Sequence, residues 1–533
     1  GNSRSSGWTW RNNLEFRQAF KEKHFLSIYV GHEVSEYKSN SNYVKYPEYD
    51  PEKGLMGVPD IDGVEDVKRK ILNLLDGLSE SRNRSVSFFV SGSYSFLDRY
   101  VVAGSIRMDG ADIIGTANRF SPLWNASFKY NVYEEGFMKK ISWLDELAFR
   151  LSYGYTGSID KNALPFGVMT FMSTDEYFGY DIPTYIQPKN PSVKWQKKED
   201  RSVGVDFALL NRRIRGTVNY YNNVTRNLLD TKNLPISVGV SSIKYNSSSV
   251  RNYGWEFSMN SQVLRTKELF WKVDFNVGMN RSKVIKTYYK DISEIPKGYD
   301  KTTPVEGAST NAWFGYRFAG IDPRTGHTLA FVDNSKREEP IGFQREDGRW
   351  VLDMDDVVNK DRESIKENLG DSYPTVNGGF RTNLSWKDFT FDANFTFMVG
   401  HKITAAYYAT SAGGVVSAAS QNVLKKEATR WRKPGDITDI PVYSSGGEYS
   451  SLNSEWYDLK LESGDFLKCT SISFGYRVPS KICQKFSLTS LRVNFNVRDV
   501  FTISGYSGLD PENFGGFSYP NSKKYMISLN IGI

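Results

Sequence analysis

The residues that could carry acid–base, nucleophilic or metal chemistry are few and scattered along the chain. The acid-rich stretch 351–363 (VLDMDDVVNKDRE) is the best candidate for a Ca²⁺ loop. It lacks the D-x-[DN]-x-[DN]-G spacing with which a short loop wraps that ion. A solvated acidic loop is therefore the favoured interpretation, and we expect no metal, no cofactor and no enzymatic activity. The four histidines form no cluster in the sequence; they are His24, His32, His327 and His401.

The two cysteines, Cys469 and Cys483, are not expected to form a disulfide with each other. Cys469 lies near the start of an expected strand, and Cys483 lies in the turn after it. About eleven strand residues at roughly 3.3 Å each separate them, whereas a disulfide needs Cα atoms within about 7 Å. We predict two free thiols.

Two tyrosine-rich stretches, 169–187 and 401–414, are candidates for substrate binding. Aromatic faces bind sugar rings and peptide side chains well while staying rigid. The same rings could instead pack the loops against each other or against a partner protein, and this alternative stays open. The candidate residues are Tyr177, Tyr180, Tyr185, Tyr407 and Tyr408.

Strict alternation of apolar and polar residues is the main structural signal. In 491–498 (LRVNFNVR) Leu491, Val493 and Phe495 alternate with Arg492 and Asn494. The same pattern recurs in 147–156, 202–209, 271–279, 389–397 and 525–533. A period of two over eight or more residues predicts a β-strand with one apolar and one polar face. The apolar face would lie on a core or in lipid, and the polar face would face water.

Several arginines fall on the polar side of such segments. A wide, wet barrel tolerates charge inside, whereas charge on a lipid-facing side costs a few kcal/mol. These arginines could guide an acidic substrate, or they could pair with neighbouring carboxylates, as charged walls must. We expect them to face a lumen; they are Arg107, Arg150, Arg215, Arg492 and Arg498.

About fifteen alternating segments can be counted, and the links between them are alternately short and long. The segments start near residues 8, 24, 84, 99, 123, 146, 200, 213, 253, 270, 377, 389, 466, 490 and 523. The short links include 21–23 (KEK) and 209–213 (LLNRR), and the long ones include 158–198, 226–252, 285–375 and 401–465. This order is typical of an up-and-down membrane barrel with periplasmic turns and long extracellular loops. The only good helical patterns are 63–78 and 415–431.

Composition is consistent with such a barrel. Mean hydropathy is −0.49, and no stretch approaches the roughly 20 apolar residues that a membrane helix needs. Barrel strands of about ten alternating residues leave only a weak hydropathy signal. The net charge of +7 is small for 533 residues and the charges are interspersed, so we expect no nucleic-acid partner. The predicted fold class is all-β, a transmembrane antiparallel β-barrel.

Several motifs, in order along nearly the whole chain, resemble the SusC-like TonB-dependent outer-membrane transporters. The tail RDVFTISGYSGLDPE followed by YPNSKKYMISLNI is similar to the family's C-terminal pattern. Upstream, ESGDFLKCTSISFGYRVPS and NPSVKWQKKEDRSVGVDFALLNRRIRGTVNYYNNVTRNLL resemble two further family blocks. The segments IRMDGAD, LSYGYTGS and NAWFGYRFAGIDPRTG match others. Asp499 stands where the family has Asn, and Ile533 stands in place of the usual terminal aromatic residue.

The resemblance implies a fold, a location and partners. Family members lie in the outer membrane of Gram-negative bacteria, in contact with its lipid, and import nutrients such as glycans or peptides with a SusD-like surface lipoprotein. The alternative is a SusC-like structural barrel within a larger outer-membrane assembly, with transport lost. The lumenal arginines could also pair with carboxylates of the family's plug domain.

The family's architecture also predicts strands outside this chain. Its members start with a TonB box and a plug domain and continue into a barrel of 22 strands. We expect residues 1–533 to form the C-terminal part of that barrel, about fifteen strands, without a plug domain. An open sheet would leave unpaired edges in lipid. A companion polypeptide, either a separate gene product or the other half of a cleaved chain, should therefore supply the plug, about seven strands and the link to TonB.

Overall fold

The structure is a computed structural model of the 533-residue chain. It describes residues 2–42, 49–50, 55–56, 78–112, 119–158, 167–174, 181–187, 189–190, 193–233, 237, 242–294, 304–335, 337–355, 362, 364–405, 425–442, 457–513 and 520–533. The helical patterns at 63–78 and 415–431 fall largely outside these residues; within the second, Lys425–Thr429 form the short 3₁₀ helix η6.

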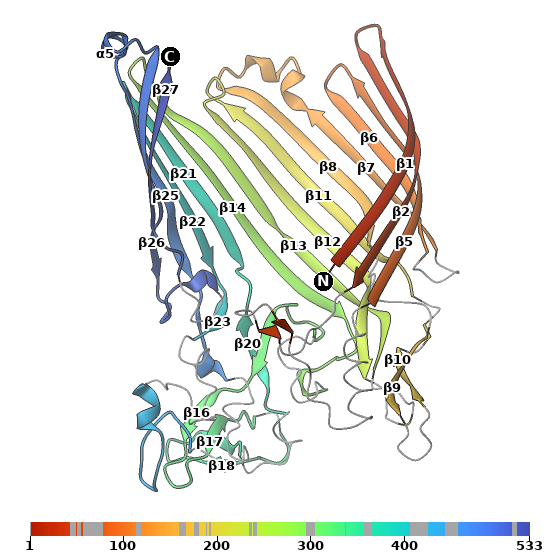
Figure 1. The fold of residues 1–533 in the computed structure, drawn as a ribbon, viewed down its shortest axis with the longest axis vertical. Helices are drawn as coiled ribbons and strands as arrows, with labels where there is room; N and C mark the ends of the chain where they lie inside the picture. The colour runs from red at the N-terminus through yellow and green to blue at the C-terminus, as the bar shows by residue number, and fades with distance from the viewer. Residues whose placement is uncertain are drawn as a thin grey trace. The chain divides into compact units, whose positions relative to one another are not determined.

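Fifteen strands form one antiparallel sheet in which chain neighbours are sheet neighbours, from β1 at one edge to β27 at the other (Figure 1). Every alternating segment of the sequence corresponds to one of them, so the predicted number and order of strands are confirmed. The strands are β1 (Asn2–Phe20), β2 (His24–Asn42), β5 (Leu78–Phe96), β6 (Tyr100–Ala111), β7 (Phe120–Asn131), β8 (Leu144–Ser158), β11 (Gln196–Leu209), β12 (Ile214–Asn233), β13 (Ser242–Arg265), β14 (Leu269–Lys286), β21 (Val376–Trp386), β22 (Phe389–Val399), β25 (Phe466–Arg477), β26 (Ser490–Ser504) and β27 (Lys524–Gly532).

Some strands begin earlier than the alternation indicates. β1 begins at Asn2 rather than near 8, β5 at Leu78 rather than near 84, and β13 at Ser242 rather than near 253. The extra residues are mostly polar on both sides of the strand. They therefore show no alternation of apolar and polar residues, although their backbones still belong to the strand. For the same reason the long link expected at 226–252 is short, with only residues 234–241 between β12 and β13.

The links at one end of the strands are tight turns. Residues 21–23, 97–99 and 210–213 connect their strands directly, and positive φ angles at their central positions give the backbone twist that a hairpin needs. Two links at the same end are longer. The link 132–143 holds the 3₁₀ helices η2 (Val132–Glu134) and η3 (Met138–Lys140), and α5 (Ser480–Lys485) lies between β25 and β26.

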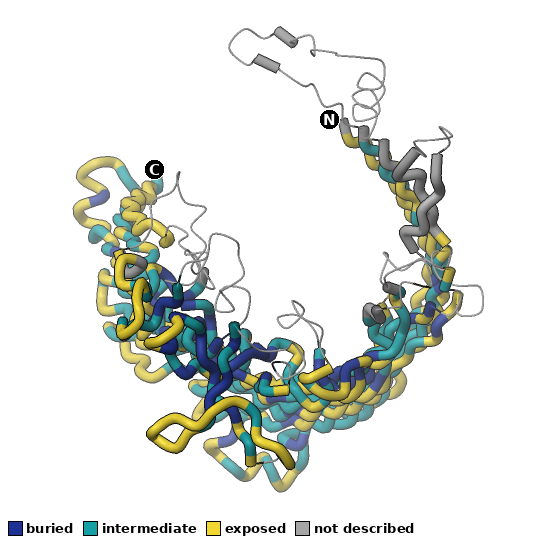
Figure 2. Tube along the Cα trace, turned by 90° about the horizontal axis from the view of Figure 1, so that it is seen from below, coloured by how far each residue is buried: buried dark blue, intermediate teal, exposed yellow. Residues whose placement is uncertain are grey.

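The chain divides into two compact units. One comprises residues Gly1–Phe128, Tyr153–Glu199 and Leu229–Asn246, and the other comprises Lys129–Ser152, Asp200–Leu228 and Ser247–Ile533. Along the strands of both units most residues are intermediate or exposed rather than buried (Figure 2). The sheet itself therefore has little of the buried core that a water-soluble sheet protein requires.

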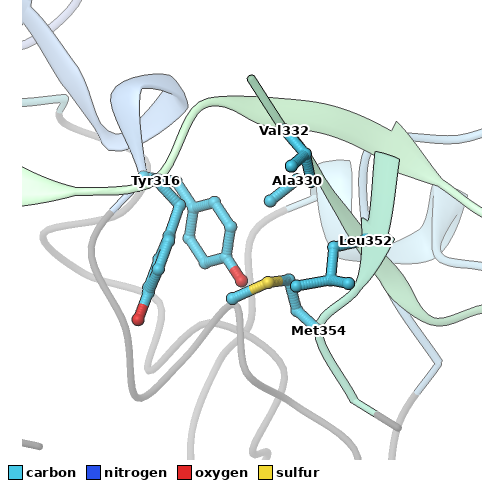
Figure 3. Packing of buried hydrophobic residues seen from close by; sticks show 6 residues of the cluster. Tyr316, Ala330, Val332, Leu352 and Met354 are labelled. Carbon is cyan, nitrogen blue, oxygen red and sulfur yellow. The ribbon is translucent and has the colours of Figure 1, made fainter. Parts of the chain in front are cut away.

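The main apolar core of the second unit lies in the long link between β14 and β21. Here β16 (Phe318–Ile321), β17 (Thr328–Phe331), β18 (Phe343–Gln344) and β19 (Trp350–Asp353) form a small sheet of their own. Figure 3 shows its packing around Tyr316, Ala330, Leu352 and Met354. Tyr457, from the link between β22 and β25, completes the cluster, with its ring centroid 5.5 Å from that of Tyr316.

The remaining short strands belong to links. They are β3 (Tyr49–Asp50), β4 (Leu55–Met56), β9 (Val168–Thr174), β10 (Asp181–Gln187), β15 (Ala312–Gly315), β20 (Glu367–Asp371), β23 (Lys402–Thr404) and β24 (Leu461–Ser463). Among the described residues, no helix combines the length and the apolar character needed to cross a membrane.

Candidate functional site

The register of the last strands separates an apolar row of side chains from a polar one. Directly paired residues of an antiparallel sheet share a face, and successive residues alternate between faces. Val493 lies between Tyr476 and Leu529, whereas the next residue, Asn494, lies between Gly475 and Ser528. In the apolar row the aromatic and aliphatic side chains are partly or fully exposed; Phe474 is 52% and Ile527 is 74% exposed. A surface this apolar and this exposed suits a lipid environment.

On the polar face of the second unit, Arg150 of β8 binds Asp206 of β11. Nε and Nη2 of Arg150 lie 2.8 and 2.9 Å from the two carboxylate oxygens, and Nη2 also donates to Asn219 Oδ1 at 2.9 Å. Thr217 Oγ1 donates to the same carboxylate at 3.0 Å. The arginine side chain is 41% exposed, so water screens this pair and its net contribution to stability is at most about 1 kcal/mol.

A cavity of about 520 Å³ lies beside this cluster. Glu146, Asp206, Arg215 and Asp274 line it, together with hydroxyl and amide groups of Thr217, Ser258, Asn260 and Asn276. Asn260 donates a hydrogen bond to Asp274, which is also 3.0 Å from Lys272 Nζ. Three carboxylates and one guanidinium on the cavity wall can hold water, cations or hydrogen-bond donors, and Phe207, Met259 and Phe275 add apolar surface to the same wall.

The other arginines expected to face a lumen, Arg107, Arg492 and Arg498, are not among the residues that line this cavity. In the first unit, Arg107 binds Asp109 at 2.6 Å and Ser87 Oγ at 2.9 Å, and its guanidinium lies 5.6 Å from the centroid of the Phe89 ring. Arg492 and Arg498 lie on β26 in the polar row. Among the described residues neither has a carboxylate within ion-pairing distance. Arg492 is paired with Arg477 and Asn530, and Arg498 with Ser471 and Lys524.

Among the described residues of the large sheet, the most buried charge is Lys468 of β25, which the alternating pattern did not single out. Its side chain is 5% exposed, and its ammonium group lies 3.3 Å from Asp499 Oδ1 and in direct contact with the Glu512 carboxylate. Asp499 reaches it from a bulge of β26, where the register moves from Arg498–Ser471 to Phe501–Cys469. Its φ is 52°, in the left-handed region that Asp tolerates better than most residues. The sequence signal for this buried contact was Asp499, because the resembling family has Asn at that position.

His401 is another buried ionisable residue, and it lies outside the strands of the large sheet. Its side chain is fully buried, and Nδ1 lies 3.9 Å from Asp465 Oδ1. Burial lowers the pKa of the imidazole, and the opposing effect of the Asp465 charge is smaller. The His401 carbonyl accepts a hydrogen bond from the Gly464 N–H, which joins the two ends of the link between β22 and β25.

The structure describes only one of the five candidate tyrosines. Tyr185 lies in β10, where its backbone is paired with Met169 of β9. Tyr177, Tyr180, Tyr407 and Tyr408 lie outside the described residues. The structure therefore neither gathers these tyrosines into a site nor separates them, and their substrate-binding role remains a prediction.

The acidic stretch 351–363 is only partly described. The Asp353 carboxylate lies 2.9 Å from His327 Nδ1. The Asp355 carboxylate accepts a hydrogen bond from the Thr328 N–H at 2.8 Å. Residues 356–361 and 363 are outside the described residues. Across the described part of the chain, no group of three or more His, Cys, Asp or Glu side chains is arranged to hold a metal ion.

Both cysteines are free and buried, as predicted from their separation along the strand. Cys483 lies in α5, where its thiol is 3.5 Å from the Val478 carbonyl oxygen. Cys469 lies in β25, beside the bulge that carries Asp499.

Comparisons with known proteins agree with this architecture. Residues 1–351 match the family described as TonB dependent receptor-like, beta-barrel. The TonB-dependent receptor SusC of Bacteroides thetaiotaomicron is 26% identical over 473 residues, which cover 85% of this chain and 44% of SusC. TonB-dependent receptor P3 of Formosa agariphila is 25% identical over 464 residues, covering 84% and 43%. This chain thus spans about half the length of these relatives.

A solved structure titled as the RagAB peptide transporter has the same fold. The superposed region covers 99% of the present chain and 56% of the chain in that structure, with a TM-score of 0.77 and 23% sequence identity. The family match covers well over half of the 533 residues and agrees with the fifteen antiparallel strands and their two-faced register. The chain therefore belongs to the TonB dependent receptor-like β-barrel family and is a SusC-like transmembrane barrel protein of the outer membrane of a Gram-negative bacterium.

Proposed function

We propose that the chain forms part of a TonB-dependent importer that takes up glycans or peptides together with a SusD-like surface lipoprotein. The observation that carries this proposal is the polar row of the sheet. It bears a partly exposed Arg150–Asp206 pair, and four charged groups belong to the lining of the neighbouring 520 Å³ cavity. A wall with these properties suits a wet lumen through which a polar solute passes, whereas a dry, packed interior would not keep such a cavity.

The names of the relatives support the same function. SusC is named as a TonB-dependent receptor, and the RagAB structure is titled as a peptide transporter. These names favour import over a purely structural barrel and transport over catalysis. They leave open whether this chain handles glycan or peptide, because loops grafted on one fold set the substrate.

We also propose that further strands close the barrel. β1 and β27 are the edges of the sheet, and nearly all of the residues in β27 are exposed. In lipid, each unsatisfied backbone group costs several kcal/mol, so a row of them exceeds the stability of any ordinary domain, about 5–15 kcal/mol. Strands that accompany a plug domain, about seven in a 22-strand barrel, would pair with both edges and carry the connection to TonB.

Two measurements test these proposals. Protein purified from native outer membranes should contain the plug-bearing strands and the lipoprotein when it is analysed by denaturing electrophoresis and mass spectrometry. Cells lacking the gene should lose uptake of a labelled oligosaccharide or oligopeptide to the same extent as cells lacking TonB. An intact complex whose loss leaves uptake of all such solutes unchanged would favour the structural-barrel alternative. A stable closed barrel without additional strands would refute the closure proposal.

A further inference from the structure

A basic surface lies on the apolar side of the β13–β14 hairpin, just beyond the apolar residues. Along this face the register pairs Phe257 with Val277 and then Trp255 with Met279. Trp255 and Met279 are 54% and 49% exposed, as befits lipid contact. The next two pairs on the same face are Tyr253–Arg281 and Arg251–Lys283. The face thus changes within one pair from apolar to cationic, towards the end of the hairpin that carries the long links.

Within the described residues, the three cations of this surface lack the ion pairs that Arg107, Arg150 and Arg381 form, as do Arg492 and Arg498 of the polar row. Arg251 Nε donates to Asn222 Oδ1 at 2.8 Å, and its guanidinium lies 4.9 Å from the centroid of the Tyr253 ring. Arg281 and Lys283 are exposed. In the part of the chain that the structure describes, none of the three has a carboxylate within ion-pairing distance, whereas Arg150, Arg107 and Arg381 each have one. Three clustered cations on the lipid-facing side of the sheet can bind an anionic group from outside the chain.

A cavity of about 370 Å³ lies beside these cations. The cavity runs along the edge of β14, from Asn280 to Val284. Two backbone hydrogen bonds flank it, one from the Asn280 N–H to Thr375 O and one from the Val284 N–H to Ala308 O. Tyr253, Arg281 and Lys283 line it, and so do polar groups of Asn311, Asn368 and Tyr373. Asp371 also lines it, and its buried Oδ1 accepts no hydrogen bond from the described residues. Amide, phenol and carboxylate groups of this kind can hydrogen-bond the hydroxyls of a sugar ring.

We propose that this surface binds the headgroup of a phosphorylated glycolipid in the leaflet of the outer membrane that faces the cell surface. Arg281, Lys283 and Arg251 hold the phosphate, because guanidinium and ammonium groups bind phosphate strongly at a membrane interface. The sugar enters the cavity beside them. The lipid chains then run down over Trp255 and Met279. A soluble substrate would not need cations that continue a lipid-facing row. The proposal rests on the barrel and on the expectation from the link lengths that the long links face the cell surface, but not on import.

The test is lipid retention by the whole protein complex purified from membranes in mild detergent. The complex is washed, and bound phosphoglycolipid is quantified by mass spectrometry; affinity is then measured in nanodiscs containing the lipid or its dephosphorylated form. The variant is Arg281→Gln with Lys283→Gln. Its matched control is Arg265→Gln with Lys267→Gln, which removes the same charge from exposed residues at the opposite end of the same hairpin. Neither substitution touches a buried residue, so both proteins should assemble.

We expect the double variant to lose affinity for the phosphorylated lipid by on the order of 30-fold, since each basic residue near a membrane surface contributes about a fivefold effect. The control variant should bind the phosphorylated lipid as tightly as the wild type does. Removing the phosphate from the lipid should weaken its binding to the wild type about as much as the double substitution weakens binding of the phosphorylated lipid. Equal loss in the control, or equal binding of both lipids, would overturn the proposal. Displacement of the lipid by millimolar inorganic phosphate would show a simple anion site and would also overturn it.

Discussion

Replacing Lys468 by Met should destabilise the contact between the last long link and the sheet. Removing one partner of a fully buried ion pair costs about 3–5 kcal/mol, because the other charge is left without compensation. Here two carboxylates are left, those of Asp499 and Glu512, and their side chains are 25% and 31% exposed. Water reaches both groups, so we expect a smaller loss, about 2–3 kcal/mol, in the free energy of unfolding. Asp510, whose charge also acts on Lys468, adds to the repulsion that remains.

The assay is denaturant unfolding of the membrane-extracted protein, together with hydrogen exchange of residues 505–513. Lys481→Met removes an exposed cation from α5 and serves as the control, with an expected change within about 0.5 kcal/mol. A double-mutant cycle with Asp499→Asn isolates the pair: the double variant should be more stable than the sum of the single losses predicts. Strict additivity, or an effect of Lys468→Met no larger than that of the control, would refute the buried ion pair.

Three further outcomes are expected. Val493→Arg places a charge in the lipid-facing row and should cost about 2–4 kcal/mol near the midplane and reduce assembled protein, whereas Asn494→Arg should assemble nearly normally; equal loss from both would indicate a dry interior. Because burial lowers the pKa of His401, the unfolded chain binds more protons than the folded one as pH falls through about 6.5. Hydrogen-exchange protection of residues 400–405, corrected for intrinsic rates, should therefore be complete above about pH 7.5 and weaker at about pH 5.5, and His401→Gln should remove this dependence. Protease added to intact cells should cleave within 287–375 but not at 210–213, and cleavage at 210–213 without permeabilisation would reverse the proposed orientation.

The sequence predicted the strands well because a two-faced strand leaves a local, periodic signal. β22 and β26 are examples, since each alternates aromatic or aliphatic residues with Asn, Asp, Arg or Thr. The early starts of β5 and β13 could not be predicted in this way, because segments such as 242–249 (SIKYNSSS) are mostly polar and lack a clear apolar alternation. Whether such a segment continues a strand depends on its neighbour, which is a long-range property.

The site was predictable only in outline. Alternation placed Arg150 on the polar side, but its partner Asp206 is 56 residues away and is brought close only by the pairing of β8 with β11. Lys468 looks like an ordinary polar residue of a strand until the bulge of β26 and the turn at Pro511–Asn513 place Asp499 and Glu512 around it. Bulges and loop conformations have no periodic signature, so contacts of this kind need the folded structure.

The small sheet between β14 and β21 has a consequence for how this protein can be altered. Its core includes Tyr457 from the link between β22 and β25, Leu459 of that link packs against the core, and the two ends of the segment meet where Ala312 is paired with Asp371. The same link hydrogen-bonds to the segment, because the Gly435 N–H donates to Pro323 O and the Val442 N–H donates to Gly326 O. A transplant onto the barrel of a relative should therefore fold only when residues 312–371 are exchanged together with the link between β22 and β25, and the surface of the protein can then be diversified while the strands stay constant.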